Sequence, residues 1–289
     1  MFGENHAHIF MNALDYHQAV KDHEKTPDEG LIRAHFKAYQ EKQVSFVRDG
    51  GDYLHVSYKA REIAPEYGID YRTPVFAIHK NGHYGGIVGR GFDTMKEYAA
   101  LVKEVRKEGG DFIKIMTTGI MDFDTDGSIT GTALSFGEVR EMVHIAHEEG
   151  FCVMSHTNGA RAVKEAAAAG ADSIEHGNYA DEEALEIMAE MGTVWVPTIT
   201  VVKNLIGKGR FSDQVLNQIW EKGKKNIRRG YEAGVNLALG SDAGAYLVPH
   251  GQGILDERAC FQEILGDKAD LKERLLKGEA LIQEKFRKV

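Results

Sequence analysis

The sequence of 289 residues has few cysteines, few prolines and no long apolar run. Its two cysteines, Cys152 and Cys260, cannot build a disulfide framework or a cysteine zinc site, and so low a content is typical of a reducing compartment. No stretch approaches the ~18 apolar residues of a membrane span, and the opening MFGENHAHIF lacks the basic and apolar regions of a secretory signal. We therefore expect a cytoplasmic protein with no membrane partner.

Positive charge is scarce relative to negative charge. The formal net charge of −9 and the pI near 5.8 disfavour a phosphate backbone or an anionic surface as the main partner. The aromatic residues do not interleave a basic face, so we expect a small-molecule substrate and no nucleic acid. With five prolines and no Ser/Gly-rich or single-sign charged stretch, nothing marks a linker, and residues 1–289 are predicted to form one domain.

Short apolar runs alternate with segments of helical period along the whole chain. The runs predict about eight strands, at residues 5–10, 44–48, 74–78, 112–116, 152–156, 173–176, 193–197 and 236–241. The segments between them predict helices at residues 28–41, 53–67, 94–108, 135–149, 159–169, 181–191 and 213–233. This pattern predicts an α/β fold of the (β/α)8 TIM-barrel type, with a doubly wound open sheet as the alternative. Chemistry favours the barrel, because its reactive side chains converge at the C-terminal ends of many strands.

Four histidines stand at ends of predicted strands. His6 and His8 are two residues apart in the first strand, so their side chains leave on the same face and can share one metal. His156 ends the run CVMSH, and His176 ends the run SIEH. Taken singly, His156 and His176 are more typical of a core or loop position, and the first pair is also typical of a solvated start of the chain.

Lys114 and Asp242 complete the set of ligand-type residues at strand ends. Lys114 lies between two isoleucines in FIKIM, where an ammonium is costly unless it is paired or chemically changed. Two alternatives stay open: an ion pair with a buried carboxylate, or a neutral amine that takes up carbon dioxide and bridges two metals as a carbamate. Asp242 follows the run NLALGS, and it can be either a turn residue or a metal ligand. Five separate strand ends with ligand-type residues together indicate a metal centre.

The order His-x-His, Lys, His, His, Asp resembles that of the amidohydrolase superfamily, in its two-metal branch with a bridging carboxylated lysine. The chain is similar to the prolidase-like and imidazolonepropionase-related members over roughly residues 5 to 265. The stretches that carry the resemblance are VSFVRDGG, FIKIMTTG, VMSHTNGA, AAGADSIEHG, MAEMGTVWVPT and EAGVNLALGSDAG.

The resemblance implies a centre of two divalent cations, with zinc as the default metal. It assigns His6, His8 and Asp242 to one cation, His156 and His176 to the second, and N6-carboxylated Lys114 to the bridge. A hydroxide held between the cations would attack the substrate, and Asp242 would accept its proton and return it to the leaving amine.

Residues that contact the substrate are less well marked. His83, in HKNGHYGG, matches a family position where a histidine contacts the substrate. His250, in VPHG, follows Asp242 closely enough to lie near the metals, and Lys80 and Arg90 are further candidates to bind a substrate carboxylate. Each of these side chains is equally typical of a solvated surface position.

The sequence departs from the resemblance at both ends. Family members usually carry strands before the first histidine pair and after the last helix, which together form a small β-sandwich. Here the pair begins at residue 6, and residues 266–289 indicate a charged helical tail. We therefore predict a barrel without the β-sandwich, in which a homo-oligomer contact or the tail covers the first strand.

The predicted activity is hydrolysis of an amide or peptide-like C–N bond in a small molecule, such as an N-acyl amino acid, a dipeptide or a cyclic amide. The alternatives are a one-metal deaminase of a small heterocycle, which Lys114 disfavours, a lactone or phosphoester hydrolase, and a metal-binding protein without catalysis. The segment DFDTDG opens like a calcium loop, but its twelfth position is Ala133. We expect residues 122–127 to form a polar loop over the barrel mouth instead.

Overall fold

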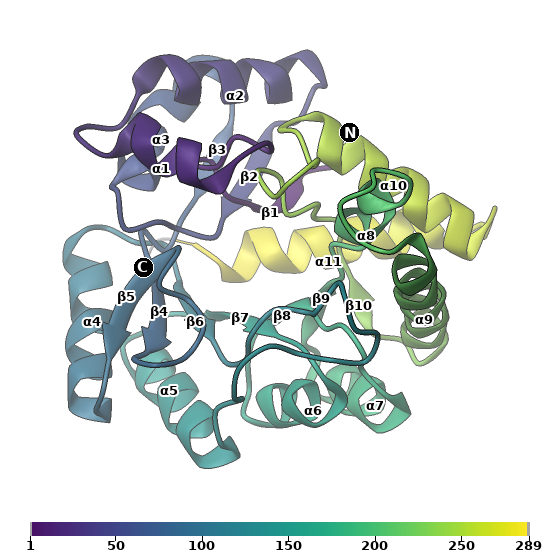
Figure 1. Cartoon of the computed structure of the whole chain (residues 1–289). Helices are drawn as coiled ribbons and strands as arrows, with labels where there is room; N and C mark the ends of the chain where they lie inside the picture. Colours follow the sequence, from purple (N-terminus) through teal and green to yellow (C-terminus); the bar gives the residue numbers. More distant parts are fainter. Residues whose placement is uncertain (1, 288–289) are drawn as a thin grey trace.

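The computed structural model describes residues 2–287, and in it parallel strands are surrounded by helices (Figure 1). The strands are β1 Glu4–Ala7, β2 Phe46–Asp49, β3 Asp70–Arg72, β4 Ala77–Lys80, β5 Gly89–Phe92, β6 Ile113–Met116, β7 Val153–Thr157, β8 Ser173–His176, β9 Val194–Val196 and β10 Asn236–Leu237. The helices are α1 Tyr16–His23, α2 Glu29–Glu41, α3 Val56–Ile63, the 3-10 helix η1 Ala64–Tyr67, α4 Met95–Lys107, α5 Phe136–Glu148, α6 Ala160–Ala168, α7 Glu182–Met191, α8 Thr200–Leu205, α9 Asp213–Glu232, α10 Gln252–Leu265 and α11 Leu271–Lys285.

The strands form two parallel sheets that meet at both edges. One sheet has the order β1-β2-β3 and the other the order β10-β9-β8-β7-β6-β4-β5. At one junction, the chain passes directly from β3 to β4 within residues 70–80. Strand β3 pairs with β2 in the first sheet, and β4 pairs with β6 in the second. At the other, the Asp242 amide donates to the His6 carbonyl at 2.8 Å, and Ala7 bridges Ala243. The strands therefore follow one another round a ring, with β5 as an extra strand beside β4.

Helices cover the outside of this ring, and α11 covers one end of it. In Figure 1, helices α2, α4, α5, α6, α7 and α9 lie around the strands, while α11 runs across the middle of the molecule. Ile282 and Phe286, at the end of α11, share a buried apolar cluster with Phe46 and Phe112, which lie at the starts of β2 and β6. The Gly3 amide also donates to Glu279 of α11 at 2.9 Å. The predicted tail thus packs against the chain segment that leads into β1.

The predicted parallel α/β organisation is confirmed, and several boundaries are corrected. The predicted first strand, 5–10, ends at Ala7. The predicted third strand, 74–78, overlaps only β4, which begins at Ala77, and β3 is a separate strand before it. The predicted helix 53–67 begins later, at Val56, and continues as η1. Strand β5 and helices α1, α8 and α10 were not predicted; β5 contains two glycines, and α8 and α10 begin without a side-chain cap. None of the helices within residues 2–287 combines the length and apolarity needed to cross a bilayer.

Candidate metal centre

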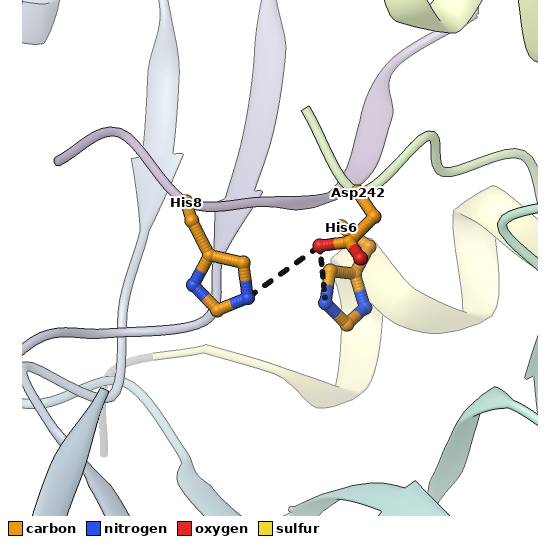
Figure 2. A group of neighbouring side chains, drawn as sticks. All are labelled: His6, His8 and Asp242. Atoms are coloured by element: carbon orange, nitrogen blue, oxygen red, sulfur yellow. Dashed lines mark ion pairs between the residues drawn. The ribbon is translucent and has the colours of Figure 1, made fainter. Parts of the chain in front are cut away.

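His6, His8 and Asp242 come together although more than two hundred residues of sequence separate them. His6 lies in β1, His8 just beyond its end, and Asp242 in the segment after β10 that is bonded to β1. The Nε2 atoms of His6 and His8 are each 3.6 Å from Oδ1 of Asp242 (Figure 2). One ligand atom from each residue lies within 4.8 Å of the others, which is compact enough to hold one cation.

His156 and His176 adjoin this group. The ring centroids of His6 and His176 are 5.0 Å apart, and those of His156 and His176 are 4.7 Å apart. Both His176 and Asp242 have left-handed backbone, with φ of 64° and 62°, a conformation that is costly for residues other than glycine and is concentrated at functional sites. The structure therefore places all four sequence-predicted histidines around one point.

Lys114, in β6, faces the same cavity as His8, His156, His176 and Asp242. Its side chain is 1% exposed, and its Nζ has no hydrogen-bond partner. Burial lowers the pKa of the ammonium to about 8, against the opposing effect of the Glu175 and Asp242 carboxylates. Among residues 2–287, no ion pair forms at Lys114, so the paired alternative left open by the sequence is not realised.

Hydrogen bonds fix the orientation of three of the imidazoles. The Glu175 carboxylate is 2.6 Å from Nδ1 of His6, Thr198 Oγ1 is 2.7 Å from Nδ1 of His176, and the Gly119 carbonyl is 3.1 Å from Nε2 of His156. In each ring, this leaves the other nitrogen available to a metal, an arrangement common among histidine ligands. The free Nε2 of His6 is buried without a hydrogen-bond partner.

The imidazoles are neutral at neutral pH, which is the form that binds metals. Burial is the largest cause of a lowered pKa in all four imidazoles, and the nearby Lys114 ammonium lowers each pKa further. It lowers the pKa of His8 and His156 to about 3 and holds the pKa values of His6 and His176 well below their usual range. Burial raises the pKa of Asp242 to about 6.

The residues that support His6 were not among those predicted from the sequence. Arg48 of β2 donates to both oxygens of Glu175, at 2.9 and 3.1 Å, and the Ser173 hydroxyl donates to Glu175 at 2.5 Å. All three side chains are fully buried. Glu175 interrupts the apolar run of β8, and Arg48 that of β2, so the signal that singled out Lys114 applied to them as well.

The cavity next to these ligands has a volume of about 320 Å³ and mainly apolar walls. Residues from the segment between β6 and α5, including Ile120, Met121 and Phe123, form one side. The predicted polar loop is therefore apolar on its inner side. The acidic residues of this loop do not line the cavity, and one of them, Asp126, accepts from Lys222 of α9 at 2.5 Å.

The four predicted substrate contacts do not line this cavity. His83 lies with Nδ1 2.9 Å from the Thr132 carbonyl, and its neighbour Tyr84 faces the cavity instead. Both ring nitrogens of His250 are bonded within the protein, to the Tyr39 hydroxyl and the Met11 carbonyl. The side chains of Lys80 and Arg90 form ion pairs: Lys80 with Glu138 at 2.5 Å, and Arg90 with Glu104 at 2.6 Å and Glu108 at 3.0 Å.

Comparison with known proteins agrees with this geometry. Residues 60–272 match the model of the Amidohydrolase family, and the chain belongs to this family. The ochratoxinase of Aspergillus niger is 27% identical over 191 residues, which are 63% of this chain and 38% of that protein. An uncharacterized protein of Mycobacterium tuberculosis is 29% identical over 173 residues, 57% of this chain and 45% of the relative. The chain thus spans less than half the length of either relative.

Solved structures share the fold over almost the whole chain. A Xaa-Pro dipeptidase with bound methionine in its active site has a TM-score of 0.77 and 22% identity, and covers 98% of this chain and 75% of its own. The Aspergillus niger ochratoxinase has a TM-score of 0.75 and 20% identity, with 96% and 68% covered. At these identities the likeness concerns the fold alone.

Proposed function

We propose that this chain is a metal-dependent hydrolase that cleaves an amide or peptide-like C–N bond of a small molecule in the cavity described above. The observation that carries the proposal is the buried Nζ of Lys114, which has no partner and faces the same cavity as neutral imidazoles and a carboxylate. A core would not keep a lone ammonium there without a role, because an unpaired buried charge is costly. Two proteins to which this chain is similar, the ochratoxinase and the Xaa-Pro dipeptidase, also carry the names of enzymes that act on small substrates.

The proposed centre holds two divalent cations on a (β/α)8 barrel. His6, His8 and Asp242, whose ligand atoms lie within 4.8 Å of one another, would hold one cation. His156 and His176, each with one ring nitrogen outside the hydrogen bonds described above, would hold the other. Lys114, as its carbamate, would bridge them: carbon dioxide binds the neutral amine, one proton leaves, and the product carries one negative charge. Imidazole and carboxylate ligands suit several metals, and we propose zinc.

Bound cations supply a polarised carbonyl and a more acidic water. In the proposed reaction, Asp242 would accept the proton of the attacking water and return it to the nitrogen of the leaving amine. The apolar walls hold the substrate and limit the access of other water molecules.

The test is the metal content of protein purified without chelator, for the native chain and for Lys114→Ala. Lys80→Ala is the matched control, since Lys80 is paired with Glu138 outside the cavity. We expect about two equivalents of metal per chain for the native protein and the control, and a clear loss of metal for Lys114→Ala. We also expect the native protein to hydrolyse members of a panel of N-acyl amino acids and dipeptides. One equivalent of metal, unaffected by the substitution, would overturn the bridged centre and favour a deaminase.

We also propose that the protein is a homo-oligomer, which analytical sedimentation would test.

A further inference from the structure

The rim of the cavity carries one cationic side chain that the proposed catalytic machinery does not use. Arg210 lies on the segment between α8 and α9 and lines the cavity with its neighbour Phe211. Apart from the buried Lys114, no other lysine or arginine among residues 2–287 lines this cavity. Within the described part of the chain, Asp242 is the only carboxylate in the same lining. The cavity is therefore an apolar space with ligand-type residues at its base and one guanidinium at its rim.

Arg210 is held by aromatic rings and not by a carboxylate. Its Cζ lies 4.4 Å from the ring centroid of Tyr246 and 5.4 Å from that of Phe211. Within the described part of the chain, no acidic side chain comes within ion-pair distance of it, whereas nearby cations are paired: Lys203 with Glu263 and Lys222 with Asp126. Stacking against the rings restrains the guanidinium and leaves its N–H donors available to a ligand.

The segments around Arg210 are fastened to each other. Phe211 packs against Phe123 of the loop that follows β6, with ring centroids 5.3 Å apart. That loop is held from α9 by the ion pair between Lys222 and Asp126. The Tyr179 hydroxyl accepts from the Gly127 amide at 2.9 Å and fastens the same loop to the segment after β8. Arg210 is thus presented by a restrained rim.

We propose that Arg210 binds an anionic group of the substrate, so that the enzyme prefers acidic amides with an apolar body, such as N-acyl amino acids with a free carboxylate. A planar guanidinium binds a carboxylate through two parallel N–H donors, and the apolar walls take the remainder of the substrate. The charge of Arg210 then selects for the free acid over its carboxamide. This inference rests on the proposed amide hydrolysis and names its substrate class.

The test compares an N-acyl amino acid with its C-terminal carboxamide, in the native protein, Arg210→Met and Arg210→Lys. Methionine keeps an apolar stem and removes the charge, and lysine keeps the charge without the planar fork. A charge-assisted hydrogen bond is worth about 1.5–3 kcal/mol, so we expect the acid-to-carboxamide ratio of kcat/KM to fall by about 10- to 100-fold in Arg210→Met. Arg210→Lys should keep part of the preference for the acid, because the positive charge remains. Lys208→Met, an exposed cation of the same segment outside the lining, is the control and should keep the native ratio.

Two outcomes would overturn the assignment: no preference for the acid in the native protein, or equal losses on both compounds in Arg210→Met. A binding measurement separates this failure from failure of the proposed activity. If neither compound is hydrolysed, calorimetric binding of the acid and of the carboxamide still reports the contribution of Arg210. A preference for the acid that disappears in Arg210→Met then supports the anion site, while the absence of turnover counts against amide hydrolysis alone.

Discussion

Individual side chains at the candidate centre are held by partners that lie one step further from the cavity. His6 is the clearest case, because its Nδ1 contacts Glu175, which in turn is bound by Arg48 and Ser173. The carboxylate fixes the tautomer and the direction of the ring, so that Nε2 faces Asp242. Glu175 thereby has a positioning role.

Replacement of Glu175 by glutamine tests this role. The amide keeps the shape but weakens the bond to His6, and we expect zinc affinity to fall about 10- to 100-fold, the usual scale for such supporting partners. Isothermal titration of zinc into metal-free protein measures the change. Glu138→Gln, which alters an ion pair outside the cavity, is the control. Unchanged affinity in Glu175→Gln would show that His6 is oriented without this carboxylate.

Lys114 should affect stability and metal binding in opposite directions. In metal-free protein its buried ammonium has no partner, so Lys114→Met should raise the free energy of unfolding by about 1–3 kcal/mol. The same variant should lose the stabilisation that added zinc gives the native chain. Urea unfolding with and without zinc measures both effects. A metal-free variant less stable than the native protein would contradict this account of Lys114.

At the scale of elements, the end of β2 comes very close to the first histidine pair. Gly50 follows β2, and a Cβ built on it would lie 2.3 Å from Cε1 of His8. A side chain at this position would displace the imidazole. The glycine is thus required by the approach of two neighbouring strands.

Gly50→Ala should therefore reduce zinc affinity about tenfold or more, on the scale at which ligand support acts, while the fold is kept. Gly137→Ala is a matched control, because Gly137 lies in α5 and a Cβ there would meet no atom within 4 Å. Zinc titration and far-UV circular dichroism measure binding and folding. Native affinity in Gly50→Ala would mean that His8 does not need its present position.

Helix α10 binds the start of α8 through a buried carboxyl group. The amides of Ile199 and Thr200 donate to Glu257 at 3.1 and 2.7 Å. Burial raises the pKa of Glu257 from 4.5 to about 8, against the effect of these two donors. The folded protein therefore keeps this proton over a pH range in which the unfolded chain has lost it, and the contribution of Glu257 to stability is greatest below pH 4.5.

As the pH rises from 4.5 towards 8, that contribution should decline. Glu257→Gln cannot ionise, so the unfolding free energy of the native protein minus that of the variant should fall over this range. One pKa unit corresponds to about 1.36 kcal/mol, so the fall is a few kcal/mol at most. Urea unfolding of both metal-free proteins at several pH values tests it. A difference that is constant or rises with pH would contradict the raised pKa.

At the scale of the whole molecule, α11 closes the end of the ring opposite to the metal ligands. Phe286 is fully buried, its ring lies 5.3 Å from that of Phe112, and the guanidinium of Arg48 lies 4.5 Å from its centroid. The side chain of Phe286 thus contacts the same arginine that binds Glu175. The segment at the end of α11 is therefore in contact with Arg48, one of the residues that hold Glu175 against His6.

Phe286→Ala should lower the free energy of unfolding by about 3–5 kcal/mol, because it removes a large buried ring and leaves a cavity. Leu276→Ala in the same helix is the control: Leu276 is 40% exposed and its removal should cost little. Chemical denaturation measures both. A small effect of Phe286→Ala would show that α11 is not needed to close the ring.

Much of the fold could be predicted because the signals are local. Helices α4, α5 and α7 begin at capping residues that precede an apolar period, and their predicted bounds agree with the structure within one residue. Strand β8 was predicted with its observed bounds. Strand β5, by contrast, is a strand only because its residues Gly89 to Phe92 pair with β4, and two glycines in four residues gave no local preference for it.

The sequence by itself determined the parallel α/β organisation, because this depends on periodicity. It also predicted six ligand-type residues, from the residue types at strand ends. Only the tertiary structure decided which charges are paired. Lys80 and Arg90 resembled substrate anchors but meet carboxylates on neighbouring helices, whereas Arg210 meets none and faces the cavity. It also decided that Glu175 and Arg48 support His6, since that contact joins β1, β2 and β8. Pairing and burial depend on side chains far apart in the chain, which no local pattern records.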